Sequence, residues 1–123
     1  MTATTSNPLI LLVDDDTRVR RLCRVILERA GFLIIEADSA FSAQTVWRVN
    51  CHAIDLLITD HDMPGMTGLQ LMTALRATRA DLKVLMISGN CQESFPPSIP
   101  FLQKPFSPAE LSEAVQRCLF SHP

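Results

Sequence analysis

A chain of 123 residues with a net charge of −2 is long enough for one domain with a single core and too short for two domains of ordinary size. Its composition, 47% hydrophobic and 20% charged, is typical of a soluble globular protein and predicts no binding to nucleic acid or to an anionic membrane. The longest uninterrupted apolar run, Leu9–Val13, is far shorter than the ~18 residues of a membrane span. Met1–Pro8 lacks the basic residues of a secretory signal, so the cytoplasm is the expected location.

Five short apolar runs have the character of β-strands and alternate with stretches of helical period. In chain order they are Leu9–Val13, Phe32–Ala37, Asp55–Thr59, Lys83–Ile87 and approximately Ile99–Gln103. Several of these runs are apolar almost throughout, as expected for strands of a parallel sheet that is covered on both faces.

Amphipathic helices are expected between and after these strands. They are Val19–Ala30, a helix capped by Ser39, a helix from about Gly68 to Thr78, and a closing helix capped by Ser107. Gly31 is the expected stop of the first helix. Glu110, three residues after Ser107, completes a capping box at the start of the last helix.

Alternating strands and helices predict a doubly wound parallel sheet, because right-handed crossovers place helices on both of its faces. We expect one domain over residues 9–120, preceded by a flexible tail over residues 1–8. In such a fold the reactive residues lie at the carboxyl ends of the strands. Five polar residues occupy these positions: Asp14, Asp15, Asp60, Ser88 and Lys104.

Each of these polar residues taken alone is typical of an ordinary loop, but together they favour a site. Carboxylates ~5 Å apart in a cleft repel one another by ~3 kcal/mol per pair at an effective dielectric constant near 20, so a cation must lie among them. Oxygen ligands favour Mg²⁺, and Lys104 supplies a fixed positive charge. A carboxylate beside Mg²⁺ and Lys, with the Ser88 hydroxyl nearby, can attack a phosphoryl group and keep it as an acyl phosphate.

The four cysteines, Cys23, Cys51, Cys91 and Cys118, form no C-x-x-C pair, which argues against a zinc cluster and a redox dithiol. Cys23 and Cys118 fall on apolar helix stripes and are expected to be small buried hydrophobes. Cys51 lies beside His52 in a predicted loop, but no third partner completes a metal site or a catalytic set.

Four segments of the chain together resemble the receiver (phosphoacceptor) domain of two-component response regulators. They are Leu11–Asp16, Leu57–Gly68, Val84–Gly89 and Phe101–Phe106. The segments stand in the order of that family and span essentially the whole chain, so the resemblance is more specific than any single motif. It implies a flavodoxin-like five-stranded sheet of order 2-1-3-4-5.

The resemblance also implies a role for each site residue. Asp60 would be the phosphoacceptor and a metal ligand, Asp15 a direct ligand of Mg²⁺ and Asp14 a ligand through water. Asp62 would lend its backbone carbonyl to the metal. Asp16 is given no metal role, and is expected only to act as a helix N-cap or first-turn acid.

Three further positions complete the implied site. Ser88 would donate a hydrogen bond to the phosphoryl group, and Lys104 would pair with a phosphoryl oxygen. Phe101 stands where many receivers have an aromatic side chain that rotates as Ser or Thr moves toward the phosphoryl group. Two roles stay open for Phe101: an ordinary aromatic residue of the core, or a switch residue that rotates in this way.

The clearest departure from the family lies between the fourth and fifth strands. Only twelve residues, Gly89–Pro100, separate Ser88 from Phe101, whereas a helix with its two loops needs roughly eighteen. Three prolines in this segment also oppose a continuous helix. We therefore expect the helix that is fourth in the family's order to be shortened or missing, replaced by an irregular loop or one helical turn. Asp62 and Asn90 stand at positions that, in the family this chain resembles, tune how fast the acyl phosphate hydrolyses, which leaves that rate open.

The expected function is that of a phosphoacceptor and not of a turnover enzyme. A sensor histidine kinase or histidine phosphotransfer protein would supply the phosphoryl group, Mg²⁺ would be the cofactor, and an unknown downstream protein would receive the signal. One alternative is a degenerate receiver that binds a partner without being phosphorylated. Another is a haloacid dehalogenase-type phosphatase, because Asp60-His61-Asp62 imitates its Asp-x-Asp motif. Free-standing and hybrid-kinase receivers both stay open.

Overall fold

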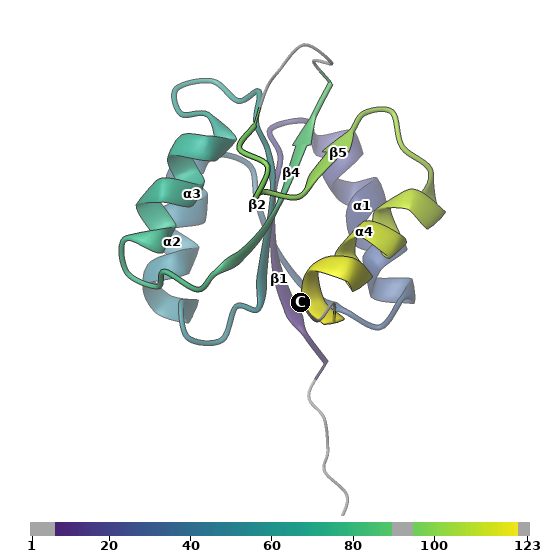
Figure 1. Cartoon of the computed structure of the whole chain (residues 1–123), viewed down its shortest axis with the longest axis horizontal. Coiled ribbons are helices and arrows are strands. Elements are labelled where there is room, and N and C mark those ends of the chain that lie inside the picture. The colour runs from purple at the N-terminus through teal and green to yellow at the C-terminus, as the bar shows by residue number, and fades with distance from the viewer. Residues whose placement is uncertain (1–6, 90–94, 121–123) are drawn as a thin grey trace, which may run out of the picture.

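The sheet carries the site and has five parallel strands in the order β2-β1-β3-β4-β5 (Figure 1). The structure, a computed structural model, describes residues 7–89 and 95–120. Its strands are β1 (Leu9–Val13), β2 (Leu33–Ala37), β3 (Leu56–Asp60), β4 (Lys83–Ser88) and β5 (Phe101–Gln103). The predicted strand order is confirmed.

Helices cover both faces of this sheet. They are α1 (Thr17–Arg29), α2 (Ala40–Asn50), α3 (Gly68–Arg76) and α4 (Pro108–Phe120). Figure 1 shows α2 and α3 on one face and α1 and α4 on the other, as the doubly wound prediction requires. None of these helices, within the part of the chain that is described, is long and apolar enough to cross a membrane.

A hydrophobic core lies on each face of the sheet, where the side chains of the strands pack against the helices that cover that face. Along β1, Leu11 and Val13 enter the core under α2 and α3, whereas Ile10 and Leu12 enter the core under α1 and α4. Side chains of a strand alternate between its faces, so a strand covered on both faces must be apolar at every position. The uninterrupted run in the sequence is therefore the signature of a central strand.

Helix ends follow the local sequence signals. The Asp16 side chain accepts hydrogen bonds from the backbone N–H groups of Arg18 and Val19, which confirms it as the N-cap of α1. The Ser39 side chain caps α2, and Ser107 and Glu110 exchange the two bonds of a capping box. Gly31 ends the α1 turn with a φ of +99°, a backbone conformation that favours glycine.

Strand boundaries differ from the predicted ones where a backbone group has another partner. Phe32 precedes β2 instead of starting it, because its N–H donates to Leu27 at the end of α1. Ile99 precedes β5 in a turn in which its N–H donates to the carbonyl of Pro96 at 3.0 Å. Asp55 precedes β3, and its carboxylate accepts the N–H of Leu9 at 2.8 Å.

The connection from β4 to β5 contains no helix in its described residues, Gly89 and 95–100. Residues 90–94, on which the prediction of a shortened helix also falls, lie outside the described part of the chain. The side chain of Phe95 packs against the core under α2 and α3. Within the described part of this connection, Ile99 is buried in the same core, so two of its side chains cover this face of the sheet.

Candidate functional site

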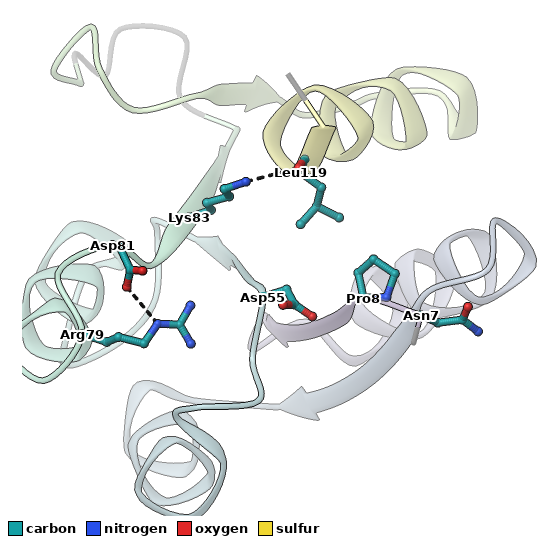
Figure 2. Close-up of a pocket in the computed structure, with 7 residues that line it drawn as sticks. All are labelled: Asn7, Pro8, Asp55, Arg79, Asp81, Lys83 and Leu119. Atoms are coloured by element: carbon teal, nitrogen blue, oxygen red, sulfur yellow. Dashed lines mark hydrogen bonds and ion pairs between the residues drawn. The ribbon is translucent and has the colours of Figure 1, made fainter. Parts of the chain in front are cut away.

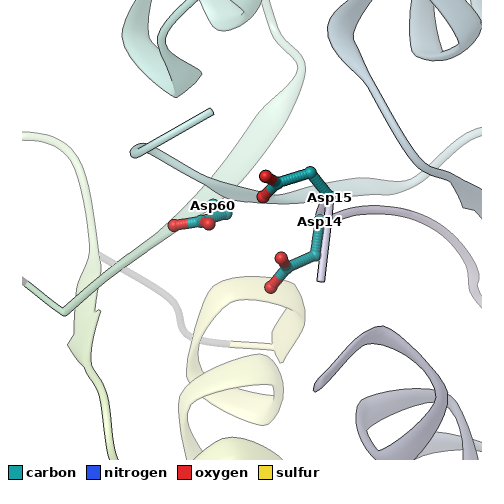
Figure 3. Close-up of side chains that lie close together, drawn as sticks. All are labelled: Asp14, Asp15 and Asp60. Atoms are coloured by element: carbon teal, nitrogen blue, oxygen red, sulfur yellow. The ribbon is translucent and has the colours of Figure 1, made fainter. Parts of the chain in front are cut away.

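Three carboxylates gather at the carboxyl edge of the sheet, as predicted. Asp14 and Asp15 follow β1, Asp60 ends the neighbouring strand β3, and one oxygen from each lies within 4.8 Å of the others (Figure 3). Asp14 and Asp60 are 3% and 5% exposed, whereas Asp15 is open to solvent. The cluster therefore has a buried base and an accessible side.

Lys104, the residue after β5, contacts two of these carboxylates from the far side of β4. Its Nζ lies 3.2 Å from Asp14 Oδ2 and 3.4 Å from Asp60 Oδ2. The backbone N–H of Lys104 donates to the carbonyl of Ser88 at 2.9 Å, which fixes the base of the side chain beside the end of β4. The site thus contains a positioned cation in addition to its acids.

Electrostatics of the site are set by burial and by these neighbours. Burial first, and then the Asp14 carboxylate, raise the pKa of Asp60 above its ordinary value, and Lys104 only partly offsets this. Burial lowers the pKa of the Lys104 ammonium, but Asp14 and Asp60 outweigh burial and raise it. Lys104 is therefore charged, while the Asp60 carboxylate is held in an unfavourable environment.

Backbone contacts preorganise the two buried carboxylates. Asp14 Oδ1 accepts the N–H of Asp16 at 2.9 Å, and Asp60 Oδ1 accepts the N–H of Asp62 at 3.2 Å. The Arg20 guanidinium donates to the backbone carbonyl of Asp14 at 2.8 Å and pairs with Glu36. These contacts hold the chain after β1 and β3 in the conformation that places both acids.

Sequence reasoning missed Arg20. The sequence did contain a signal for Arg20. Arg20 lies three residues before Cys23 and seven before Leu27, on the buried stripe of α1. A charged residue on a buried stripe requires a partner, and here the partners are Glu36 and the backbone at Asp14.

The hydroxyl of Ser88 points to a side chain that the sequence gave no reason to pair with it. Ser88 ends β4 and is fully buried, and its Oγ donates a hydrogen bond of 2.8 Å to Asp62 Oδ2. Asp62 lies in the loop after β3 and is exposed. The role of the Asp62 backbone carbonyl as a metal ligand stays a prediction.

An aromatic row connects the residue after Asp60 to β5. The rings of His61 and Phe95 meet edge to face at 4.9 Å, and the rings of Phe95 and Phe101 lie 5.0 Å apart. Phe101 is 38% exposed, so it is packed only in part, and its role as a switch stays a prediction. Phe95 was missed, although it is the only aromatic residue of the short Gly89–Pro100 segment.

None of the three cysteines that the structure describes belongs to the acidic cluster. Burial, and then Asp14, raise the pKa of the Cys23 thiol to about 11, and burial raises that of Cys118. Both are the packed residues that were expected. Cys51 lies at the end of α2, and among the described residues the only cluster with metal-ligand geometry is that of Asp14, Asp15 and Asp60. Cys91 lies outside the described residues.

A pocket of about 340 Å³ at the opposite edge of the sheet is lined by charged side chains that already have partners (Figure 2). Lys83 donates to the carbonyl of Leu119 at 3.2 Å, and Arg79 pairs with Asp81 at 3.1 Å. Asp55 accepts the N–H of Leu9. These contacts link the ends of strands and helices to one another. The carboxyl edge of the sheet is therefore the candidate functional site.

The first turn of α3 lies against the site and depends on a glycine. A Cβ atom on Gly68 would lie 2.7 Å from the backbone oxygen of Asp60 and 2.7 Å from the Sδ atom of Met86. We expect Gly68→Ala to lower the free energy of unfolding by about 2 kcal/mol, because α3 must move away from β3.

Gly89→Ala is the matched control, since a Cβ atom there would have Lys104 Cβ, at 4.0 Å, as its nearest described neighbour. Its expected effect is within about 0.5 kcal/mol. Urea denaturation of both variants measures the difference. Equal stabilities would show that α3 does not need the close approach at Gly68.

Fold and site together define an α/β domain with a preorganised acidic centre and a lysine at the carboxyl edge of a parallel sheet. The family model of the response regulator receiver domain matches residues 10–116. The chain belongs to this family, whose members are signalling domains of two-component systems and not turnover enzymes. The alternative hypothesis of a haloacid dehalogenase-type phosphatase gains no support, because Asp60 ends the third strand of the sheet.

Similar proteins include free-standing receivers and receivers within longer proteins. The chain is 31% identical to the response regulator receiver protein CpdR of Brucella abortus, covering 91% of this chain and 97% of CpdR. It is 32% identical to the sensor kinase CckA of the same organism, covering 89% of this chain but only 12% of CckA. The chain also spans 25% of the transcriptional regulator DctD of Pseudomonas aeruginosa.

Solved receiver structures share the fold. The receiver domain of the hybrid histidine kinase CckA has a TM-score of 0.80 and 32% identity, covering 90% of this chain and 98% of that domain. The response regulator TrrA of Thermotoga maritima, solved in complex with Mg²⁺ and beryllofluoride, has a TM-score of 0.82 and 28% identity. The match covers 91% of this chain and 99% of TrrA.

Proposed function

We propose that this receiver accepts a phosphoryl group on Asp60 from a histidine kinase or a histidine phosphotransfer protein, in a Mg²⁺-dependent reaction, and then signals through a protein partner. The observation that carries the proposal is the contact of Lys104 with both Asp14 and Asp60, beside the third carboxylate of Asp15. This arrangement supports the proposal because it would bring a nucleophile, a cation and a set of metal ligands to one place.

The donor set fits Mg²⁺. Carboxylate oxygens of Asp15 and Asp60 and the backbone carbonyl of Asp62 would hold the ion directly, and Asp14 would hold it through water. The acidic cluster contains no His or Cys that would favour zinc. When bound, Mg²⁺ would offset the negative charge on the phosphoryl oxygens. The open side of the cluster at Asp15 supports access for the donor.

The transfer requires little from the protein beyond position and charge. A carboxylate oxygen of Asp60 attacks phosphorus and forms the new P–O bond, while the bond from phosphorus to the donor breaks and its electron pair leaves with the donor. The ammonium of Lys104 offsets charge on the transferred oxygens, and the hydroxyl of Ser88 donates to one of them. The product is an acyl phosphate on Asp60.

A phosphorylation-independent interaction module is the second candidate, favoured by the helix-free residues described between β4 and β5. Receivers commonly present a helix here to their partners, and residues 89 and 95–100 of this chain form none. The two candidates differ in whether Asp60 is modified.

Intact mass measured after incubation with acetyl phosphate and Mg²⁺ separates them. The expected result is one added phosphoryl group per chain, absent when EDTA replaces Mg²⁺, because the charge of the carboxylate cluster then repels the anionic donor. No adduct at any Mg²⁺ concentration would contradict the proposal and favour the interaction module.

A further inference from the structure

The side chain of Asp62 makes a contact that the proposed reaction does not use. Its Oδ2 accepts the hydroxyl of Ser88 at 2.8 Å, across the gap between the loop after β3 and the end of β4. The backbone N–H of Asp62 is held on Asp60 Oδ1 at 3.2 Å. One residue thus contacts both the phosphoacceptor, through its backbone, and the hydroxyl at the end of β4, through its side chain.

A serine hydroxyl has one proton to donate, while a carboxylate can only accept, so the proton that Ser88 gives to Asp62 is not available to another acceptor. Hydrogen bonds to an ionised acceptor are about twice as strong as bonds between neutral groups. Ser88 is fully buried, so its hydroxyl cannot turn to bulk water when it leaves Asp62. A phosphoryl oxygen on Asp60 therefore competes with Asp62 for the same proton.

We propose that Asp62 is a positioning residue that retains the Ser88 hydroxyl in the unphosphorylated protein and must release it before Ser88 binds the phosphoryl group. The inference rests on the proposed function. Asp62 then disfavours the phosphorylated state, because the Asp62–Ser88 hydrogen bond must break before Ser88 can bind a phosphoryl group.

Charge repulsion between Asp62 and the phosphoryl group would also disfavour the phosphorylated state. Repulsion and retention of the hydroxyl differ in whether the effect of Asp62 depends on residue 88. Repulsion acts whether or not residue 88 has a hydroxyl. Retention of the hydroxyl requires it, so the effect of Asp62 must vanish in a Ser88→Ala background and persist in a Ser88→Thr background.

Beryllofluoride with Mg²⁺ is the probe, and its dissociation constant is measured for the wild type, Asp62→Ala, Ser88→Ala and the double variant. We expect Asp62→Ala to bind the probe about fivefold tighter than the wild type. In the Ser88→Ala background the same change should alter affinity by less than about twofold, and Ser88→Thr should restore the larger effect. Thermal unfolding without the probe checks that each variant is folded.

Three outcomes overturn the inference. If Asp62→Ala tightened beryllofluoride binding equally with and without the Ser88 hydroxyl, the effect would be due to charge alone. If Asp62→Ala left the affinity for beryllofluoride unchanged, the Asp62–Ser88 bond would not oppose binding. A wild type that binds no beryllofluoride, with variants that also bind none, would overturn the proposed function and this inference with it. In the first two outcomes the wild type still binds the probe, so the failures are distinguishable.

Discussion

An Asp60→Asn variant is expected to take up no phosphoryl group from acetyl phosphate, because an amide has no carboxylate oxygen to attack phosphorus. The same variant is expected to be more stable than the wild type when Mg²⁺ is absent. A carboxylate oxygen of Asp60 lies within 4.8 Å of one from Asp14 and one from Asp15, and Asp60 is 5% exposed, so its charge is costly when no cation is bound. Loss of activity and gain of stability should therefore arise from one substitution.

The expected gain is about 1–2 kcal/mol in the free energy of unfolding at neutral pH, since Lys104 offsets only part of the repulsion. Burial and then Asp14 raise the pKa of Asp60, so the folded protein binds this proton more tightly than the unfolded chain does. The cost of Asp60 is thus complete above its folded pKa and is relieved as the pH falls through that value. The advantage of Asn should shrink on acidification, and it should also shrink when Mg²⁺ is added to the wild type.

Urea denaturation between neutral and acidic pH, with and without Mg²⁺, measures these changes. Asp81→Asn is the matched control, because Asp81 is exposed and pairs with Arg79 at the opposite edge of the sheet. That control should keep wild-type phosphorylation. An Asp60→Asn variant that is less stable than the wild type in metal-free buffer would show that the carboxylates do not repel one another as described.

Lys104→Met is the second variant with a large expected effect. We expect its rate of phosphorylation by acetyl phosphate to fall by about 100-fold or more, the size of effect seen when one preorganised donor to a developing charge is removed. Lys104 contacts Asp14 at 3.2 Å and Asp60 at 3.4 Å, so its loss also leaves two buried carboxylates without their cation. Initial rates of adduct formation, followed by mass, measure the effect.

Lys83→Met removes an equal charge from the far edge of the sheet, where Lys83 donates to the carbonyl of Leu119. Its phosphorylation rate should stay within about twofold of the wild type, since an exposed charge at that distance is screened by salt. If both lysine variants were slowed equally, net charge and not the position of Lys104 would govern the reaction.

Most of the fold followed from short-range signals in the sequence. Uninterrupted apolar runs such as Leu9–Val13 indicate strands buried on both faces, and capping residues such as Ser39 mark where helices begin. Because parallel strands end at one edge, the convergence of Asp14, Asp60 and Lys104 could also be predicted, and the distances confirm that these three side chains meet.

Contacts between loops could not be predicted in this way. The hydrogen bond between Asp62 and Ser88 joins residues 26 positions apart, and it depends on the backbone path after β3, which no local pattern specifies. Strand boundaries at Phe32 and Ile99 were wrong for a related reason. Their N–H groups donate to a helix end and to a turn, and these partners outweigh the preference of both residues for strands.

Chemical mapping of the modified residue tests the phosphoacceptor most directly. Borohydride reduces an acyl phosphate to an alcohol, so a phosphorylated aspartate becomes homoserine, which peptide mass spectrometry can locate. The expected result, after treatment with acetyl phosphate and Mg²⁺, is homoserine at position 60 and at no other aspartate. Homoserine at position 14 or 15, or a phosphoryl group that survives reduction on Ser88 or His61, would contradict the assignment of Asp60.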